Sequence, residues 1–265
     1  MHELVEIVLT SALVVWAYMT LFYFLALAGK NASVADSGWG MGFILVSTVL
    51  LNMNMDLSML QMMVHVLVTV WGVRLAVHIF TRNMGRDEDW RYANWRKEWG
   101  KHYPWRSYFQ IFMLQGLSML VIAAPIFISN LEPGANQFRL TGYVGIALWV
   151  IGFFFESVGD WQLRRFIRSQ KTKGTIMKTG VWKYTRHPNY FGEVTQWWGL
   201  FIMVIGAPYW WLAVVSPALI TYLLLKVSGI PMLEKKWAKV KEYQDYKKRT
   251  SAFFPWPPKP AKAKK

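Results

Sequence analysis

The chain has 265 residues, of which 54% are hydrophobic, 17% aromatic and only 17% charged, against about 25% charged residues in an ordinary soluble domain. It contains no Cys, which excludes a disulfide scaffold, a thiolate metal site and a cysteine nucleophile. Its five His are too few for the multi-histidine di-iron sites of membrane hydroxylases, so we expect no metal. A net charge of +15 would suggest nucleic-acid binding in a soluble protein. Here the basic residues stand between long apolar runs, and we expect no nucleic acid.

Apolar runs follow one another along the chain. The first contains Glu6 as its only charge, and it is too long for a signal-peptide core. A helix needs roughly 20 residues to span a bilayer, so we predict an all-α integral membrane protein with about seven transmembrane helices, six being the competing count. The runs lie at 4–28, 40–54, 57–81, 109–130, 140–162, 191–206 and 208–228.

The Lys and Arg residues predict the orientation of these helices. They are concentrated in 82–106, in 164–186 and from 235 onward, whereas the opposite loops carry only Arg139. Under the positive-inside rule the basic segments are cytoplasmic. With seven helices, the N-terminus is then outside and the C-terminus is cytoplasmic, and the charge reflects this orientation together with contact with anionic membrane lipids.

No internal repeat or soluble domain interrupts the pattern, so we expect one transmembrane domain over 1–258 and a disordered basic tail over 259–265. The polar segment 82–105 predicts a short amphipathic helix on the cytoplasmic interface. The segment 231–249 predicts another helix leaving the membrane, and the Pro-rich stretch after it predicts an extended, disordered end.

Ionisable residues recur at helical spacing inside three of the runs. Each costs about 2.5–3.5 kcal/mol or more at the centre of a membrane helix and therefore needs a partner or a function. Three such stripes near the cytoplasmic ends favour a polar cavity open to the cytosol. The alternatives are pairing between helices and, for Arg168, a snorkelling side chain. The stripes are Glu156, Asp160, Arg164 and Arg168; Arg74, His78 and Arg82; and Asn189, Glu193, Gln196 and Trp197.

A basic, acid-free loop beside carboxylate and amide groups suits a phosphorylated cytosolic cofactor. Arg and Lys side chains bind phosphates well, and Arg164, Arg168 or Arg186, with Lys171 and Lys173, could meet the 2′-phosphate of NADPH. The sequence has no GxGxxG or Walker loop, so neither a Rossmann nor a P-loop fold holds the nucleotide. The glycines of 38–42 open a transmembrane run, and there we expect close helix packing.

The segment 179–193 reads Thr-Gly-Val-Trp-Lys-Tyr-Thr-Arg-His-Pro-Asn-Tyr-Phe-Gly-Glu. It resembles the C-terminal signature of the steroid 5-alpha-reductase family, in a broad group that includes sterol C14- and delta-7-type reductases. The stretches 33–40, 74–82, 88–92 and 246–256 resemble the bacterial branch of that family. The resemblance runs from about residue 33 to 258, with the C-terminal signature region at about 140–258.

The resemblance implies a seven-helix reductase of the bacterial inner (cytoplasmic) membrane. Such an enzyme uses NADPH to reduce a carbon–carbon double bond conjugated to a carbonyl in a lipophilic, steroid-like or other lipid substrate, as a 3-oxo-5-alpha-steroid 4-dehydrogenase does. It would be an oxidoreductase acting on CH–CH groups. Together with the loop charges, the resemblance gives a set of cofactor-binding residues: Asp160, Arg164, Arg168, Tyr184, Arg186, His187, Asn189, Tyr190, Glu193 and Lys226.

At the substrate end the chain departs from that family. Steroid reductases use a Glu–Tyr pair to polarise the substrate carbonyl, and the corresponding places here hold Asp36 and His78, without a Tyr. An ordinary pKa near 6.5 allows a histidine to donate a proton at neutral pH, so we predict His78 as the catalytic donor with Asp36 orienting it. A packing role for His78 and donation by Tyr92 or Tyr190 are the alternatives.

Two other functions remain open. Membrane methyltransferases of the isoprenylcysteine and phospholipid types share an Arg-His-Pro-x-Tyr element, which 186–190 also fits. In that case His187 and Tyr190 would contact S-adenosylmethionine, and Glu234 would hold its charged end. A non-enzymatic lipid-binding or transport role is the third possibility, although transporters commonly show inverted repeats that are not found here.

Overall fold

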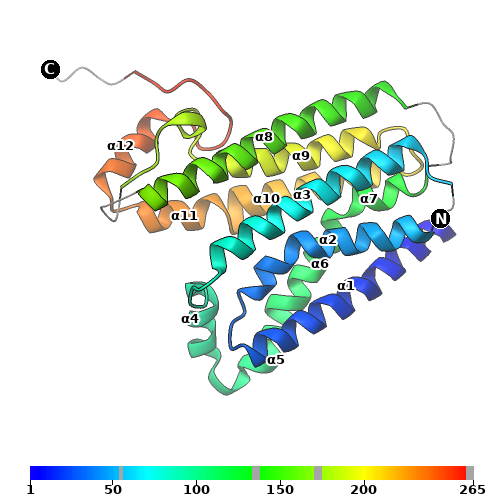
Figure 1. The fold of residues 1–265 in the computed structure, drawn as a ribbon, viewed down its shortest axis with the longest axis horizontal. Helices are drawn as coiled ribbons and strands as arrows, with labels where there is room; N and C mark the ends of the chain where they lie inside the picture. The colour runs from blue at the N-terminus through cyan, green and yellow to red at the C-terminus, as the bar shows by residue number, and fades with distance from the viewer. Residues whose placement is uncertain (54–55, 133–137, 170–174, 261–265) are drawn as a thin grey trace. The chain divides into compact units, whose positions relative to one another are not determined.

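A computed structural model describes residues 1–53, 56–132, 138–169 and 175–260 (Figure 1). Across these residues the regular structure is helical, apart from an isolated parallel bridge between Thr185 and Ser251. The chain forms two compact units: unit 1 is Met1–Arg139 with Val204–Ser216, and unit 2 is Leu140–Met203 with Pro217–Lys265. These units interleave along the sequence, and the expected boundaries of one domain over 1–258 stay a prediction.

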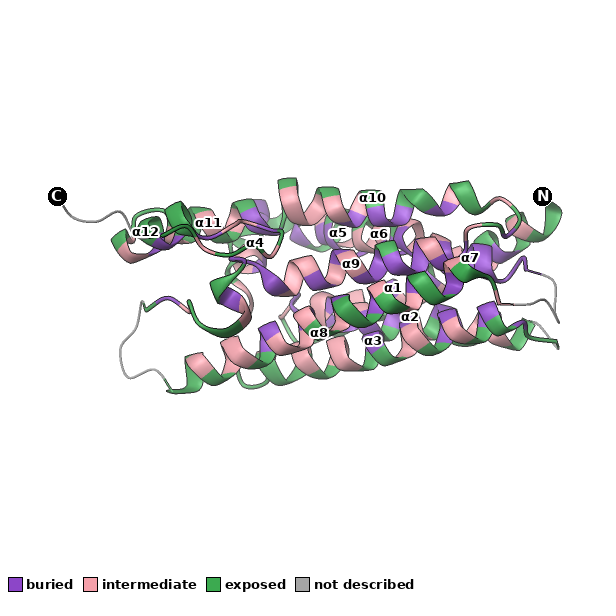
Figure 2. Ribbon diagram, turned by 90° about the horizontal axis from the view of Figure 1, so that it is seen from above, coloured by how far each residue is buried: buried purple, intermediate pink, exposed green. Residues whose placement is uncertain are grey.

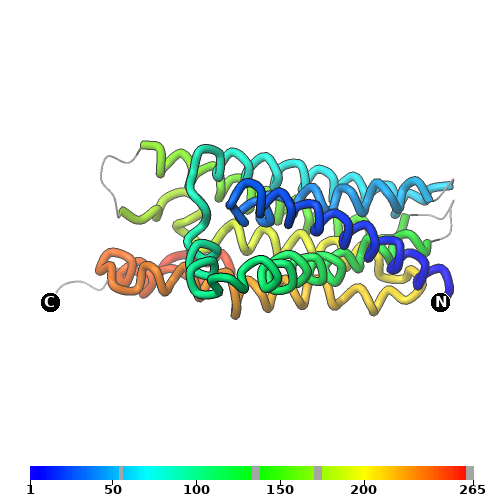
Figure 3. Tube along the Cα trace, turned by 90° about the horizontal axis from the view of Figure 1, so that it is seen from below, coloured from blue at the N-terminus to red at the C-terminus, as the bar shows by residue number. Residues whose placement is uncertain are grey.

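Unit 1 begins with three long helices, α1 (His2–Ala28), α2 (Val34–Met53) and α3 (Met59–Asn83). Ser58 caps α3 in a reciprocal capping box with Gln61, which satisfies two otherwise unpaired backbone groups. In the tube of Figure 3, the chain then enters α4 (Trp90–Trp99) beyond the end of α3. The elements that follow are η1 (Gly100–His102), α5 (Tyr103–Ser107), the π-helical η2 (Tyr108–Met113), α6 (Leu114–Ile122), α7 (Ala124–Ser129) and, much later in the chain, η4 (Trp210–Val214).

Unit 2 is built around α8 (Leu140–Ser169) and α9 (Pro188–Met203), which run side by side. Between them lies the short 3-10 turn η3 (Gly180–Lys183). The chain passes from unit 1 into unit 2 within α10 (Val215–Tyr222). It continues through the π-helical η5 (Leu223–Val227), α11 (Ile230–Trp237) and α12 (Lys241–Arg249).

Five helical segments of the described chain are long and apolar enough to cross a membrane: His2–Ala28, Val34–Met53, Met59–Asn83, Leu140–Ser169 and Trp210–Trp237. The protein is therefore all-helical with several membrane-spanning candidates, as predicted. Two other expected runs are helical but do not meet this criterion, since α9 has only 16 residues and the run at 109–130 is divided among η2, α6 and α7. The count of seven, the orientation and the particular membrane stay predictions.

Burial follows the helical repeat on the candidate spans. On α1 the buried residues Ile7, Ser11, Val15 and Met19 recur every fourth position, and in Figure 2 buried and exposed positions alternate along the same helices. Large apolar side chains on the outer faces are exposed, which fits a lipid environment.

The expected polar helices are present with different bounds. The amphipathic helix predicted within 82–105 is α4, and the helix predicted over 231–249 is two helices, because the turn 238–240 separates α11 from α12. The Pro-rich stretch after α12 is extended as expected, but hydrogen bonds fix it to the rest of unit 2. The last five residues of the predicted disordered tail, 261–265, lie outside the described residues.

The α2–α3 contact in unit 1 depends on glycines, as the 38–42 run predicted. A Cβ on Gly40 would lie 2.2 Å from the carbonyl oxygen of Gly72, and a Cβ on Gly72 would lie 2.7 Å from that of Gly40. Such backbone proximity allows short polar side chains to meet inside an apolar region.

A buried polar network uses this proximity. The Ser47 hydroxyl and His65 Nδ1 are 2.6 Å apart, and Asn130 Nδ2 lies 3.1 Å from His65 Nε2. Because the amide nitrogen of Asn130 can only donate, His65 Nε2 accepts and its Nδ1–H donates to Ser47. The network therefore links α2, α3 and the end of α7.

We expect Gly40→Ala to lower the thermal unfolding midpoint of the detergent-solubilised protein, because forced overpacking costs about 1–3 kcal/mol. Gly116→Ala is the matched control: its Cβ would meet only side-chain carbons of Val15 and Met19, at 3.2 and 3.3 Å, and these can shift. Equal midpoints for the two variants would contradict the glycine-dependent contact.

Candidate functional site

Close packing of α8 against α9 also rests on glycines. A Cβ on Gly152 would lie 2.5 Å from the carbonyl oxygen of Gly192, and a Cβ on Gly192 would lie 2.4 Å from both the Gly152 carbonyl oxygen and the Glu156 backbone nitrogen. Any larger residue would separate the helices. The polar side chains on the facing stripes of α8 and α9 are thereby brought within hydrogen-bonding distance.

Two carboxyl–amide pairs form an acid–amide ladder between these helices. Gln196 Nε2 donates to Glu156 Oε2 at 2.5 Å, and Asn189 Nδ2 donates to Asp160 Oδ1 at 3.2 Å. The two pairs are about one turn apart on α8 and about two turns apart on α9. Both carboxylates are buried, and the Oε1 atom of Gln196 is buried without a hydrogen-bond partner. The ladder therefore combines strong acceptors with one unused amide carbonyl.

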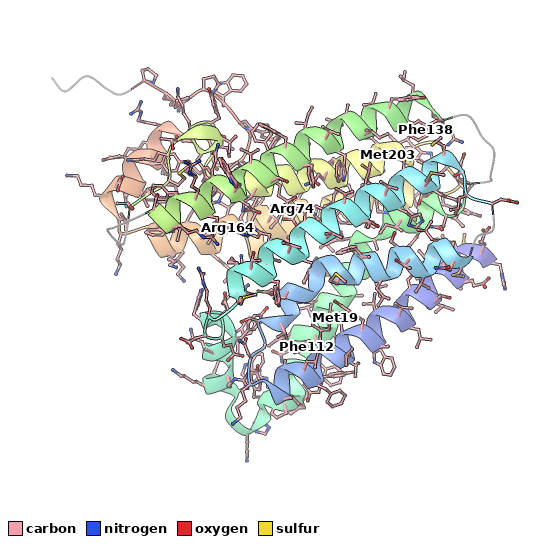
Figure 4. All side chains as sticks on the ribbon, viewed as in Figure 1. Met19, Arg74, Phe112, Phe138, Arg164 and Met203 are labelled. Atoms are coloured by element: carbon pink, nitrogen blue, oxygen red, sulfur yellow. The ribbon has the colours of Figure 1, made fainter. Side chains whose placement is uncertain are left out.

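The predicted stripe on α8 continues past the ladder. Arg164 is half-buried on the last turns of α8, where Figure 4 labels it, and Arg168 is exposed one turn later. Lys226 is exposed on η5. Of the loop cations expected to join them, Lys171 and Lys173 lie outside the described residues.

The segment before α9 is fixed to α8. Trp182 donates its indole N–H to the carbonyl of Gly159, and the backbone N–H of Val181 donates to the side chain of Gln162, each at 3.0 Å. Gly180 precedes them with φ +63°, a conformation that favours glycine. The signature segment thus enters α9 from a defined position.

Arg186 is the most heavily bonded residue of that segment. Its guanidinium donates to Glu234 Oε1 from Nε at 2.9 Å and from Nη2 at 2.5 Å, and Nη1 donates to the carbonyls of Lys247 and Thr250. Both Arg186 and Glu234 are largely buried, and Glu234 also accepts from the exposed Lys247 ammonium at 2.6 Å. These bonds give Arg186 a structural role, and its predicted contact with a cofactor stays a prediction.

His187 is buried beside this ion pair. Burial lowers the pKa of His187, and the nearby Glu234 carboxylate opposes that shift only in part. Its ring stacks on Tyr190 with centroids 5.6 Å apart, and Nε2 lies 3.5 Å from Glu234 without a hydrogen bond. Burial therefore favours the neutral form of the ring, whose Nε2 faces the Glu234 carboxylate.

The remaining predicted cofactor residues of unit 2 lie around the same segment. Tyr190 and Glu193 are partly buried on the first turns of α9, and Tyr184 is exposed before it, with Lys183 Nζ 5.8 Å from the centre of its ring. The ten predicted residues are therefore all in unit 2, while both predicted catalytic residues are in unit 1.

In unit 1 Asp36 is paired with the start of α4. Tyr92 donates its hydroxyl to Asp36 Oδ1 at 2.5 Å, and Arg91 Nη2 donates to Oδ2 at 2.7 Å. Gln115 donates to the Tyr92 oxygen at 3.2 Å and accepts from the Trp39 indole at 2.6 Å. Burial raises the pKa of Tyr92 well above its ordinary value, and the Asp36 carboxylate adds to this shift.

His78, the predicted partner of Asp36, is half-buried on α3, and its carbonyl accepts from Thr81. Pairing of His78 with Asp36 stays a prediction. The acid–tyrosine pair of Asp36 and Tyr92 was not predicted as a pair, although both residues belong to stretches that carry the resemblance. Their separation of 56 positions left no local spacing from which to find it.

The fold and these sites define a helical, multi-pass membrane protein with a buried acid–amide ladder in one unit and an acid–tyrosine pair in the other. The chain belongs to the DUF1295 family, described as a protein of unknown function, whose profile matches residues 22–250.

Individual relatives extend this finding. An uncharacterised protein of Schizosaccharomyces pombe is 23% identical over 218 residues, which cover 71% of this chain and 61% of the relative. The 3-oxo-5-alpha-steroid 4-dehydrogenase 1 of Bos taurus is 38% identical, and that of Mus musculus 34% identical, over 55 residues. Those residues are 21% of this chain and 21% and 22% of the two mammalian proteins, so the chain spans less than two thirds of each of these three relatives. No solved structure matches the chain.

These comparisons confirm the resemblance to steroid reductases over a short stretch, whereas the sequence motifs suggested it from about residue 33 to 258. The relationship that covers most of the chain, residues 22–250, is to the DUF1295 family. Both Glu234 oxygens accept hydrogen bonds from protein cations, and the methyltransferase alternative stays a hypothesis.

We expect Glu234→Ala to destabilise the protein strongly, because breaking a buried ion pair from one side costs about 3–5 kcal/mol. Lys247→Ala removes the other cation on Glu234, but Lys247 is exposed, and exposed pairs contribute roughly 0–1 kcal/mol. Thermal unfolding of both variants in detergent tests this difference. Similar midpoints would contradict the central role of the Arg186–Glu234 pair.

Proposed function

We propose that the protein is an NADPH-dependent membrane reductase of a carbon–carbon double bond conjugated to a carbonyl in a lipophilic substrate. The observation that carries this proposal is the acid–amide ladder between α8 and α9, with the signature segment at its end. The short similarity to 3-oxo-5-alpha-steroid 4-dehydrogenase 1 supports the same class of reaction.

The residues of unit 2 fit a nicotinamide cofactor in chemical terms. The unpaired Oε1 of Gln196 could accept from the carboxamide N–H, and the carboxylates of Glu156 and Asp160 could accept from amide or ribose donors. The cations at the end of α8 would hold phosphates. When bound, NADPH supplies a hydride for the β-carbon of the enone.

Arg164 and Arg168 are proposed to select NADPH over NADH. The 2′-phosphate distinguishes the two cofactors, and cationic side chains bind such a group well. The buried Arg186 already donates four hydrogen bonds to protein acceptors. We therefore propose that Arg186 positions the signature segment and that the phosphate contacts come from the α8 cations and Lys226.

At the substrate, we propose Tyr92 as the group that polarises the carbonyl. Negative charge develops on the carbonyl oxygen as hydride arrives at the β-carbon, and a positioned hydroxyl stabilises that charge. The Tyr92 hydroxyl would turn from Asp36 to this oxygen. Until then the hydrogen bond to Asp36, which Arg91 holds in place, keeps the phenol in position. The enolate that forms takes a proton from water at its α-carbon, which completes the reduction.

Tyr92 has two advantages over His78 in this role. It forms the acid–tyrosine pair with Asp36, and its raised pKa keeps the hydroxyl protonated throughout the neutral range. The substrate is proposed to be a steroid-like or other enone lipid, because the exposed outer faces of the candidate spans are apolar.

A cofactor titration tests the proposed class directly. Purified protein in detergent is heated with NADPH, NADH or S-adenosylmethionine. A bound ligand adds RT ln(1 + [L]/Kd) to the free energy of unfolding and thereby raises the unfolding midpoint. We expect stabilisation by NADPH. Stabilisation by S-adenosylmethionine alone would instead favour a methyltransferase.

We expect Arg164→Gln to weaken NADPH binding by about 10–100-fold, the equivalent of one lost hydrogen bond to a charged group of about 1.5–3 kcal/mol. Arg165→Gln is the control, since Arg165 is exposed beside the ring of Trp161 on another face of α8. Calorimetric titration with NADPH and NADH measures the effect. An equal loss in both variants, or equal affinity for both cofactors in the parent, would contradict the assignment.

We expect Tyr92→Phe to lower turnover of an enone substrate by about 100-fold or more while NADPH affinity is unchanged, as for loss of a proton donor. His78→Phe is the matched comparison. The parent rate should hold from about pH 6 to 9 with a tyrosine donor, whereas a histidine donor with an ordinary pKa near 6.5 would lose its proton as pH rises through that value. Normal turnover in Tyr92→Phe together with a loss in His78→Phe would return the role to His78.

A further inference from the structure

The segment after α12, Thr250–Lys259, is an extended strap fixed to the signature segment. We call it the C-terminal strap. Its backbone follows the loop before α9, so that residues more than 60 positions apart lie side by side (Figure 1). Its bonds are the Thr185–Ser251 bridge, Arg186 N to the Ser251 carbonyl at 2.9 Å, Trp256 N to the Tyr184 carbonyl at 3.0 Å and Lys259 N to the Arg249 carbonyl at 2.9 Å.

Two aromatic side chains of this strap are largely exposed. Phe254 is 68% exposed and Trp256 is 71% exposed, whereas the neighbouring Phe253 is buried. A flexible tail could hide such rings by collapsing, but here the backbone hydrogen bonds on either side fix their position. Large apolar side chains held in this way indicate an interaction surface.

The exposed rings continue the apolar surface of a candidate span. Phe254 and Phe253 pack against Phe191, with ring centroids 6.0 and 5.6 Å away, and Phe191 packs against Phe155 of α8 at 5.1 Å. Beside it on α8, Phe154 is 53% exposed in the middle of the span. The strap therefore lies next to the lipid-facing part of unit 2 rather than far out in solvent.

Basic residues accompany the rings. Lys183, Arg249 and Lys259 are all exposed, and they lie at the backbone bonds that hold the strap or next to them. An indole with its polar N–H beside basic residues is typical of the bilayer interface, where apolar rings such as that of Phe254 enter the acyl boundary and the basic groups reach anionic headgroups.

We propose that the C-terminal strap is an anchor on the membrane interface, with Phe254 and Trp256 inserted at the boundary between headgroups and acyl chains. This contact is independent of the proposed reductase activity. Because Arg186 bonds to Thr250 and Ser251 through its side chain and backbone, the anchor also ties the signature segment to the bilayer surface.

The chain contains no Cys, so single-cysteine variants can be labelled without background. Phe254→Cys and Trp256→Cys, each carrying an NBD fluorophore, are reconstituted as the full chain in vesicles of phosphatidylcholine and phosphatidylglycerol. We expect quenching by nitroxide-labelled lipid and loss of quenching by aqueous iodide. Both parent side chains are exposed, so the substitutions should leave the unfolding midpoint unchanged.

Two reference positions calibrate the measurement. Phe154→Cys reports the lipid-facing span, and Lys248→Cys, on the exposed face of α12, reports aqueous solvent. Iodide quenching at 254 and 256 equal to that at 248 would overturn the proposal. Protection from iodide without quenching by labelled lipid would overturn it as well, because a second protein chain would then cover the strap.

Discussion

Polar groups inside an apolar slab must find partners at short range, and in this protein glycines make that range available. Gly152 and Gly192 bring the backbones of α8 and α9 so close that the Glu156 carboxylate reaches the amide of Gln196. The same solution appears in unit 1, where Gly40 and Gly72 bring α2 against α3. Without these contacts each polar side chain would face the desolvation cost alone.

A second constraint acts on the polar end of unit 2. A guanidinium as deeply buried as that of Arg186 needs acceptors for nearly all its donors, and they come from a carboxylate on α11 and carbonyls at the end of α12. The C-terminal helices are therefore part of the environment of the signature segment. Burial of Tyr246 against the same segment, with its hydroxyl donating to the Trp182 carbonyl, adds to this link.

Helix class and the main stripes could be predicted from sequence because they depend on short, regular spacing. Glu156, Asp160 and Arg164 are four residues apart, so they share one face of α8 wherever the helix begins. The long spans can be located from hydropathy alone. The pairing of Asp36 with Tyr92 could not be predicted, because it depends on how the chain turns back after α3. The pairing of Arg186 with Glu234 could not be predicted for a related reason, because the two residues are 48 positions apart in the chain.

The length of α9 has a consequence for the surrounding bilayer. Its 16 residues rise about 24 Å, whereas the hydrocarbon core is about 30 Å thick. A helix of this length crosses only where lipids thin locally or where its polar first turn sinks below the headgroups. Either way, water approaches Asn189 and His187, at the polar end of α9, more closely than the average thickness would allow. Hydrophobic mismatch thus becomes a means by which lipid composition tunes the hydration of the acid–amide ladder.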